Sequence, residues 1–174
     1  MGFGCIKNLI VCSLAWTIAS ACLWNSAHTS ELRGKVIGVS DGDTITLLTP
    51  DHKQLKVRLA EIDAPEKSQP WGKRAKQALS DLVFSKTILV RSIGGDRYGR
   101  VLGHVYFSDR YINREVVRNG HAWAYRKYLV DRSLLQDEDH ARKNQLGLWS
   151  LTHPKPIPPW KWREKQKNNP QYSR

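Results

Sequence analysis

Beyond residue 30 the apolar residues first follow a two-residue period, which is the pattern of β-strands. Residues 36–39 lead into an Asp-Gly-Asp turn, and residues 44–48 carry β-branched side chains in a two-residue period. A second turn at residues 50–52 precedes an alternating segment at 55–59. Because both links are short, the pattern predicts an antiparallel meander of three strands.

The period becomes helical at Trp71. Apolar residues at 75, 78, 79, 82 and 83 share one helix face, with basic and polar residues on the other. Strand patterns return at residues 87–90 and 101–107. A short helix is expected around residues 112–117, capped by Gly120, and a last helix at about 131–145.

Five strands with a helix between the third and the fourth match the order of an OB-fold. The sequence therefore predicts an α+β domain, mainly a five-stranded β-barrel with three helices, over residues 31–150. Barrels of this type commonly present one face to nucleic acid.

The N-terminal segment has the features of an export signal. Lys7 is the only charged residue before Glu31, and the apolar run at 9–24 is shorter than the roughly 20 residues of a membrane-spanning helix. Small residues at 19–21 fit a cleavage site, which predicts a signal peptide over 1–21, with 27 as the latest end, and a periplasmic or secreted protein. An uncleaved anchor is one alternative. A lipoprotein lipidated at Cys22 is another, since 18–22 resembles a lipoprotein box.

The last segment, residues 151–174, differs in composition from the rest. Prolines at 154, 156, 158 and 159 argue against regular structure, and residues 161–174 are polar and basic. We therefore expect a poorly ordered Pro-rich basic tail. Its segment Trp160-Lys161-Trp162-Arg163 is either a solvated extension or a contact to nucleic acid or membrane.

The net charge of the chain indicates which class of molecule it binds. The chain has 28 Lys and Arg against 16 Asp and Glu, a formal charge of +12. Such a surplus favours a polyanion, either nucleic acid or an acidic membrane surface. The cysteines at 5, 12 and 22 all lie in or beside the predicted signal, so no disulfide or thiolate metal site is expected in the mature domain.

Three clusters carry candidate chemistry. The first, Asp41-Gly42-Asp43-Thr44, is either a plain turn or a pair of carboxylates for a hard cation. The second is Arg58 with Asp63-Ala64-Pro65-Glu66, where the proline stiffens the end of a strand. The alternative there is a loop with a helix-capping acid. In an unbroken strand Arg58 and Asp63 face opposite sides, so a shared site requires a bulge or bend.

The third cluster, Asp96-Arg97-Tyr98-Gly99-Arg100, directly precedes a predicted strand, and its alternative is a solvated loop. Together the clusters suit one task. Arg58 and Arg100 can hold a phosphate, carboxylates can hold a cation, and Glu66 is left to activate water. This combination indicates phosphodiester hydrolysis.

The joint pattern D-G-D-T, R-x₄-D-A-P-E, D-R-Y-G-R and G-L-W, over residues 34–149, resembles the staphylococcal nuclease (thermonuclease) family. The resemblance implies an OB-fold barrel with three helices and Ca²⁺-dependent hydrolysis of DNA and RNA to 3′-phosphate ends. It implies that Asp43 and Asp63 bind Ca²⁺ directly and that Ala64 contributes its carbonyl. It further implies that Glu66 is the general base and that Arg58 and Arg100 bind phosphate.

The resemblance also indicates substrate-binding residues. Arg97 stands where a lysine contacts a terminal phosphate, and Tyr98 is expected beside the nucleotide. Tyr125 and Tyr128 are candidates for a second aromatic wall, whereas Trp123 is expected in the core.

Three further expectations complete the prediction. We expect a monomer with no stable protein partner, acting on DNA and RNA. An inactive OB-fold module that only binds nucleic acid is the alternative function. The acidic residues 137–139 are expected to form a solvated helix face.

Overall fold

The computed structural model describes residues 30–168 together with Met1. The predicted export signal and the lipidation site at Cys22 lie outside the described residues. The strands are β1 (Glu31–Asp41), β2 (Thr44–Leu48), β3 (Gln54–Leu59), β4 (Ile62–Asp63), β5 (Thr87–Gly95), β6 (Val101–Phe107), β7 (Arg110–Tyr111) and β8 (Trp123–Ala124). The helices are α1 (Gly72–Val83), α2 (Ile112–Arg118), α3 (Ser133–Lys143) and α4 (Pro159–Lys167), with 3₁₀ turns at Arg126–Tyr128 and Gly147–Ser150.

Five strands close into a barrel, as predicted. The hydrogen-bonded order is β3-β2-β1-β5-β6, and a parallel pairing of β3 with β6 completes the circle. β1 pairs with both β2 and β5, and shifts in its register with β2 let it curve around the barrel. The predicted OB-fold class is therefore confirmed.

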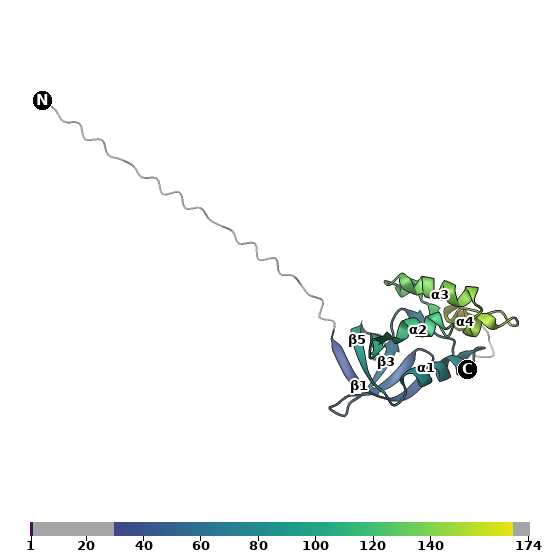
Figure 1. The fold of residues 1–174 in the computed structure, drawn as a ribbon, viewed down its shortest axis with the longest axis horizontal. Coiled ribbons are helices and arrows are strands. Elements are labelled where there is room, and N and C mark those ends of the chain that lie inside the picture. The colour runs from purple at the N-terminus through teal and green to yellow at the C-terminus, as the bar shows by residue number, and fades with distance from the viewer. Residues whose placement is uncertain (2–29, 169–174) are drawn as a thin grey trace.

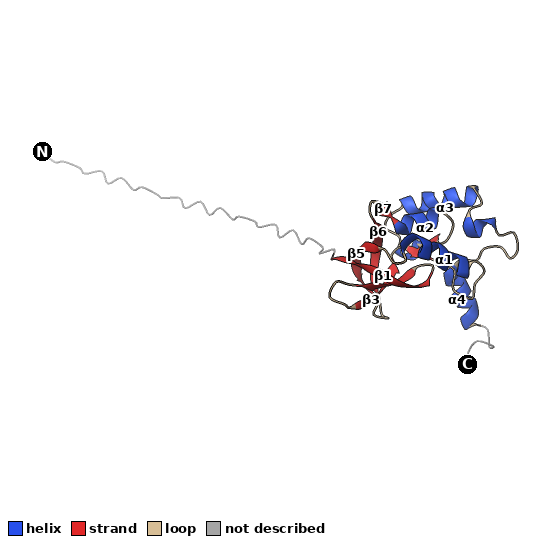
Figure 2. Ribbon diagram, turned by 60° about the horizontal axis from the view of Figure 1, so that its bottom comes forward, coloured by secondary structure: helices blue, strands red, loops and turns tan. Residues whose placement is uncertain are grey.

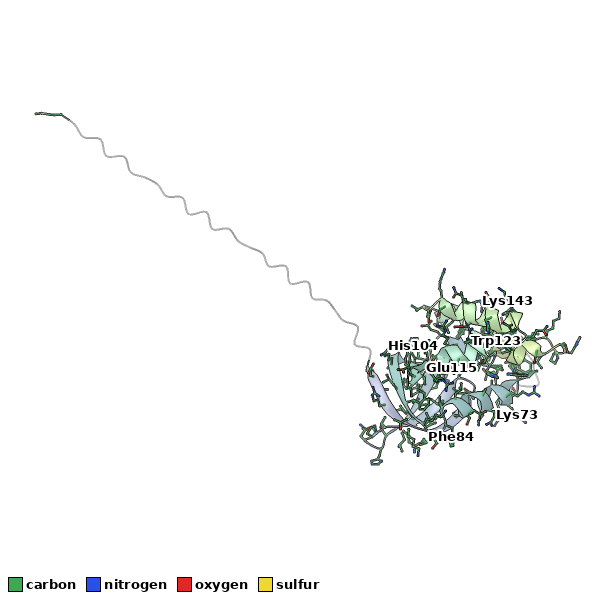
Figure 3. The ribbon with its side chains drawn as sticks, viewed as in Figure 1. Lys73, Phe84, His104, Glu115, Trp123 and Lys143 are labelled. Carbon is green, nitrogen blue, oxygen red and sulfur yellow. The ribbon has the colours of Figure 1, made fainter. Side chains whose placement is uncertain are left out.

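The helices gather at one side of the barrel (Figures 1 and 2). Apolar side chains from both halves form one continuous core. Its members include Ile45, Val57, Val90 and Val105 from the strands and Leu79, Val83, Val116 and Leu134 from the helices. Within the helical half (Figure 3), Trp123 is buried against the edge of Trp149, so its expected core role is confirmed.

The expectation of a solvated acidic face on α3 is wrong for two of its three residues. Asp137 and Glu138 are 1% and 0% exposed, whereas Asp139 is exposed. Asp137 accepts from Arg114 and Arg118 of α2. Glu138 accepts from Arg142, from both terminal nitrogens of Arg126, and from the Ala124 N–H at 2.9 Å. These carboxylates hold α3 against α2 and β8.

The expectation that the prolines exclude regular structure beyond residue 151 is also wrong. Proline fits the first turn of a helix, where no intrahelical acceptor awaits its missing N–H, and Pro159 begins α4. Pro159 is buried, and the Gln69 side chain donates to the Ile157 carbonyl. The domain therefore has four α-helices among its described residues, one more than predicted. None of these helices is long and apolar enough to span a bilayer.

Glu138→Gln is expected to lower the free energy of unfolding by about 1–3 kcal/mol, because arginine and backbone donors lose a charged acceptor. Asp139→Asn, on the exposed side of the same helix, is the matched control and is expected to change stability little. Urea unfolding followed by circular dichroism checks both. Equal stability of the two variants would contradict the buried role of Glu138.

His121 is expected to make the free energy of unfolding depend on pH. Its ring stacks on Trp71, and Trp71 Nε1 donates to His121 Nδ1 at 3.1 Å. Burial lowers the pKa of His121 below its ordinary 6.5. As pH falls through that ordinary value the unfolded chain takes up the proton first, so stability is lost. We expect His121→Gln to lose less stability than the parent between about pH 7.5 and pH 5 in urea titrations. Equal losses of stability in the parent and in His121→Gln would contradict a role of His121 in this pH dependence.

Candidate active site

The register of the barrel brings the three sequence clusters together. Thr44 of β2 pairs with Arg58 of β3, so the Asp41–Asp43 turn lies beside the end of β3. Arg58 also pairs with Leu102 of β6, which places Arg100 at the same end of the barrel. All ten predicted site residues line one pocket there: Asp43, Arg58, Asp63, Ala64, Glu66, Arg97, Tyr98, Arg100, Tyr125 and Tyr128.

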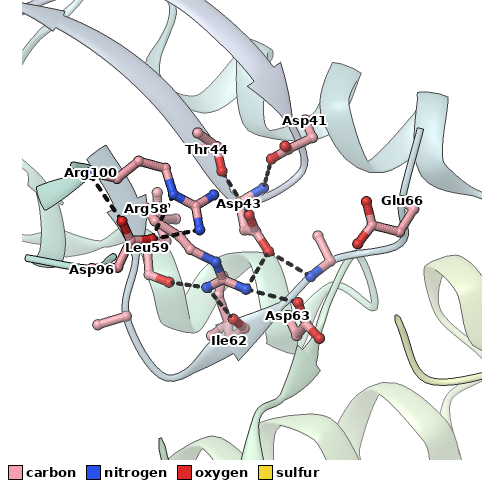
Figure 4. Close-up of polar contacts among 12 residues, drawn as sticks. Asp41, Asp43, Thr44, Arg58, Leu59, Ile62, Asp63, Glu66, Asp96 and Arg100 are labelled. Atoms are coloured by element: carbon pink, nitrogen blue, oxygen red, sulfur yellow. Dashed lines mark hydrogen bonds and ion pairs between the residues drawn. The ribbon is translucent and has the colours of Figure 1, made fainter. Parts of the chain in front are cut away.

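Arg58 lies at the centre of this site (Figure 4). Its Nη2 is 2.8 Å from Asp63 Oδ1 and 3.2 Å from Asp43 Oδ2. Its Nη1 donates to the carbonyls of Leu59 and Ile62 at 3.1 and 2.9 Å. The guanidinium is therefore fixed by backbone on one side and by two carboxylates on the other.

The bend that the sequence required between Arg58 and Asp63 is a tight turn. Glu61 has φ of 64°, a left-handed conformation that ends β3 and reverses the chain before β4. Asp63 thereby reaches the side of the chain from which Arg58 projects. The carboxylates of Asp63 and Asp43 meet at Arg58 although 20 residues separate them in sequence.

The position of Asp43 depends on close packing of its turn. A Cβ at Gly42 would lie 2.7 Å from Ala64 Cβ and 2.8 Å from Ala75 Cβ, so only glycine lets the turn approach so closely. Asp43 Oδ2 then accepts from the Ala64 N–H at 3.0 Å, and Oδ1 from the Thr44 hydroxyl at 2.9 Å. Asp41 accepts from the Asp43 N–H at 3.1 Å.

Burial and repulsion from the charge of Asp43 raise the pKa values of two carboxyl groups at this site, those of Asp41 and Asp63. Burial raises the pKa of Asp41 to about 7, and the nearby charge of Asp43 adds to the shift. Burial likewise raises the pKa of Asp63 to about 6, although Arg163 and Arg58 act in the opposite direction. Both acids therefore need hydrogen-bond donors or positive charge nearby to stay ionised.

The donor chemistry suits a hard divalent ion. Asp43 and Asp63 converge on a single nitrogen of Arg58, and carboxylate oxygens are the ligands that Ca²⁺ prefers. Across residues 30–168, no group of three His, Cys, Asp or Glu side chains is arranged to bind a metal. A cation here thus needs the backbone or water to complete its shell.

Hydrogen bonds to Asp96 orient the Arg100 side chain. One Asp96 oxygen accepts from the backbone N–H groups of Tyr98 and Arg100, at 2.9 and 3.0 Å. The other accepts from Arg100 Nε at 2.8 Å. Gly99 has φ of 75°, which the turn between them requires. Asp96 therefore sets the turn and holds the guanidinium with the same carboxylate.

Three tyrosine rings line the pocket, those of Tyr98, Tyr125 and Tyr128. Tyr98 is 68% exposed, with Arg97 over its ring at 4.9 Å. Tyr125 packs against Tyr128 in an edge-on arrangement, and its ring stacks on Trp160 of α4 at 5.3 Å with 9° between the planes. Exposed or half-exposed rings beside cationic side chains are suited to stacking with nucleobases.

Comparison with known proteins identifies the family. The family model described as "Staphylococcal nuclease homologue" matches residues 56–151. An uncharacterized endonuclease of Haemophilus influenzae is 46% identical over 156 residues, which cover 90% of this chain and 84% of the relative. A micrococcal nuclease of Shigella flexneri is 43% identical over 150 residues, 80% of this chain and 84% of the relative.

The chain belongs to the staphylococcal nuclease family. It is a nuclease, and the prediction of a phosphodiester hydrolase is confirmed. The family match also confirms the resemblance read from the motifs. The matched residues 56–151 include Arg58, Asp63, Glu66 and Arg100 but neither the Asp41–Asp43 turn nor α4.

Two further residues belong to the candidate site. Sequence reasoning did not single out Glu61 and considered Arg163 only as part of the tail segment 160–163. Arg163 of α4 donates to both Asp63 and Glu66. Glu61 Oε2 accepts from the N–H groups of Val130 and Asp131, and its carbonyl accepts from the Tyr125 N–H at 2.7 Å. Glu61 thus fixes the segment that carries Tyr125 and Tyr128. Neither residue belongs to a local motif, because each contact joins segments more than 60 residues apart in sequence.

We expect Glu61→Ala to loosen residues 125–131, because two backbone donors lose their shared acceptor. Amide hydrogen exchange should quicken in that segment and stay unchanged in β5 and β6. Glu31→Ala, which removes an exposed carboxylate paired with Arg91, is the control. Unchanged exchange at 125–131 would contradict the positioning role of Glu61.

Proposed function

We propose that this nuclease hydrolyses DNA and RNA with Ca²⁺ as cofactor and leaves 3′-phosphate ends. The observation that carries the proposal is the partly buried Arg58, held between Asp43 and Asp63 in the pocket that also contains Glu66 and Arg100. The sequence predicted no second set of residues that combines phosphate-binding arginines, cation-binding carboxylates and a candidate general base.

In the proposed complex Arg58 and Arg100 bind the scissile phosphate. A guanidinium offers parallel N–H donors to phosphate oxygens and stays charged at every accessible pH. The negative charge on the phosphorane-like transition state exceeds that of the bound diester, so fixed cations lower the barrier. Both guanidinia are held in place before substrate arrives, Arg58 by Leu59 and Ile62 and Arg100 by Asp96.

Asp43 and Asp63 are the proposed ligands of Ca²⁺, with the Ala64 carbonyl as a third. Support comes from the convergence of the two carboxylates and from the Ala64 N–H bond to Asp43, which keeps this peptide beside them. When bound, the cation would supply positive charge next to the phosphate oxygens.

Glu66 is the proposed general base. Its carboxylate projects toward the acidic cluster in Figure 4, and its side chain is 38% exposed, so water can reach it. In the proposed step Glu66 takes a proton from a water molecule and the water oxygen attacks phosphorus. The bond to the 5′ oxygen breaks, and that oxygen takes up a proton from solvent water and leaves as the alcohol. The new phosphate then stays on the 3′ oxygen.

Substrate bases would lie along the aromatic borders of the pocket. Tyr98 with Arg97, and Tyr125 with Tyr128, are the proposed contacts. Stacking of this kind needs unpaired bases, so single-stranded regions are the favoured substrate.

We also propose that the nuclease is exported and acts as a monomer outside the cytoplasm. The apolar run at 9–24 and the small residues before position 22 support export, with lipidation at Cys22 as the alternative. The charge of +12 supports a nucleic-acid partner rather than a stable protein partner.

The mature protein should cleave single-stranded DNA in Ca²⁺ and stop when the ion is chelated. Glu66→Gln should lower kcat by roughly 10²–10⁴-fold, because a general base contributes about that much. Arg100→Ala should lower kcat/KM by roughly 10²-fold or more through the loss of a charge on the phosphate. A fluorescent oligonucleotide assay measures both, and product-end analysis identifies the 3′-phosphate.

Asp109→Asn removes an exposed carboxylate from the turn between β6 and β7 and is the matched control. It should cut at the parent rate. Full activity in excess chelator would overturn the cofactor, and parent rates in both site variants would overturn the assigned roles. Tight binding of DNA without cleavage would favour the inactive binding module instead.

A further inference from the structure

The C-terminal helix α4 places a guanidinium on two acids of the site. Arg163 Nη2 is 2.7 Å from Asp63 Oδ2, and Nη1 is 2.6 Å from Glu66 Oε1 and 3.2 Å from Asp63 Oδ1. Ninety-seven residues separate Glu66 from Arg163 in sequence. The contact is therefore a product of how α4 docks on the barrel.

The docking of α4 is specified by several other contacts. Pro159 is buried, and Gln69 holds the carbonyl of Ile157 just before the helix. One turn before Arg163, Trp160 stacks on Tyr125. These contacts fix the helix along the rim of the pocket, so the Arg163 side chain enters the pocket from a defined position.

The charges explain why a guanidinium is favourable at this place. Arg58 is shared between Asp43 and Asp63 and cannot neutralise both. Asp63 is 1% exposed, and a buried carboxylate needs a full set of donors. Arg163 supplies them, and its own pKa is raised because hydrogen bonds to Asp63 and Glu66 outweigh the opposing effect of burial.

The same oxygens are the ones that the proposed function needs. Asp63 Oδ1 already accepts from Arg58 and Arg163, and Oδ2 accepts from Arg163. A divalent ion bound to Asp63 would approach the guanidinium at close range, and the two positive charges would repel each other. Glu66 Oε1 likewise accepts from Arg163, so this contact occupies one of the two carboxylate oxygens that could accept from a water molecule.

We propose that Arg163 is an internal competitor for the site: it occupies Asp63 and Glu66 until a divalent cation displaces it. This inference rests on the proposed roles of Asp63 and Glu66. The concentration of Ca²⁺ needed to load the nuclease is then set in part by one arginine side chain outside the region matched by the family model.

Calorimetric titration with Ca²⁺ alone, without nucleic acid, tests the competition directly. In the full mature chain, Arg163→Gln should bind Ca²⁺ about tenfold or more tightly than the parent, because a charge-assisted contact no longer has to be broken. Arg163→Lys should fall between them, since an ammonium keeps the charge but not the paired geometry. Circular dichroism confirms that each variant is folded.

Lys165→Gln is the matched control, because it removes one positive charge from an exposed position on the same helix. Its affinity for Ca²⁺ should stay within about twofold of the parent, since exposed charges are screened by solvent and salt. In the parent, Ca²⁺ should also quicken amide exchange in α4.

Equal affinities in Arg163→Gln and Lys165→Gln would overturn the competition while leaving Ca²⁺ as the cofactor. Absence of Ca²⁺ binding in the parent and in every variant would overturn the competition together with the metal assignment. The two failures are therefore distinguishable in one set of titrations.

Discussion

The site depends on the partly buried guanidinium of Arg58. Asp41, Asp43, Asp63 and Glu66 line one pocket, and their charges would drive the turn and the loop apart without a cation between them. Arg58 of strand β3 supplies this positive charge, and the backbone carbonyls of Leu59 and Ile62 fix the orientation of its guanidinium. The guanidinium is shared between Asp43 and Asp63, and a second arginine, Arg163, contacts Asp63 and Glu66.

Strand pairing in the barrel explains why these residues lie at one end of it. Pairing of β3 with β2 on one side and with β6 on the other puts Asp43, Arg58 and Arg100 at one end of three adjacent strands. Glu61 then reverses the chain so that Asp63 returns to Arg58, and the same residue holds the segment of Tyr125. The closed barrel and the left-handed turn at Glu61 thus bring together groups from distant parts of the sequence.

The sequence predicted what local patterns encode. Two-residue periodicity predicted the strands, and the motifs around Arg58 and Arg100 predicted residues that do share a pocket. Contacts between distant segments were not predictable in this way. Glu138 looks solvated in sequence, and only the arginines that pack around it show that it is buried. Arg163 follows four prolines, which are equally typical of a tail and of a chain that leads into a helix.

The central claim is that Arg58, Asp43, Asp63 and Glu66 form one centre for phosphodiester hydrolysis. A crystal structure of the Glu66→Gln variant with Ca²⁺ and a short single-stranded oligodeoxynucleotide tests it most directly. The account predicts a cation on Asp43 and Asp63 and a backbone phosphate between Arg58 and Arg100. Oligonucleotide bound on another face of the barrel, with no cation at these carboxylates, would contradict it.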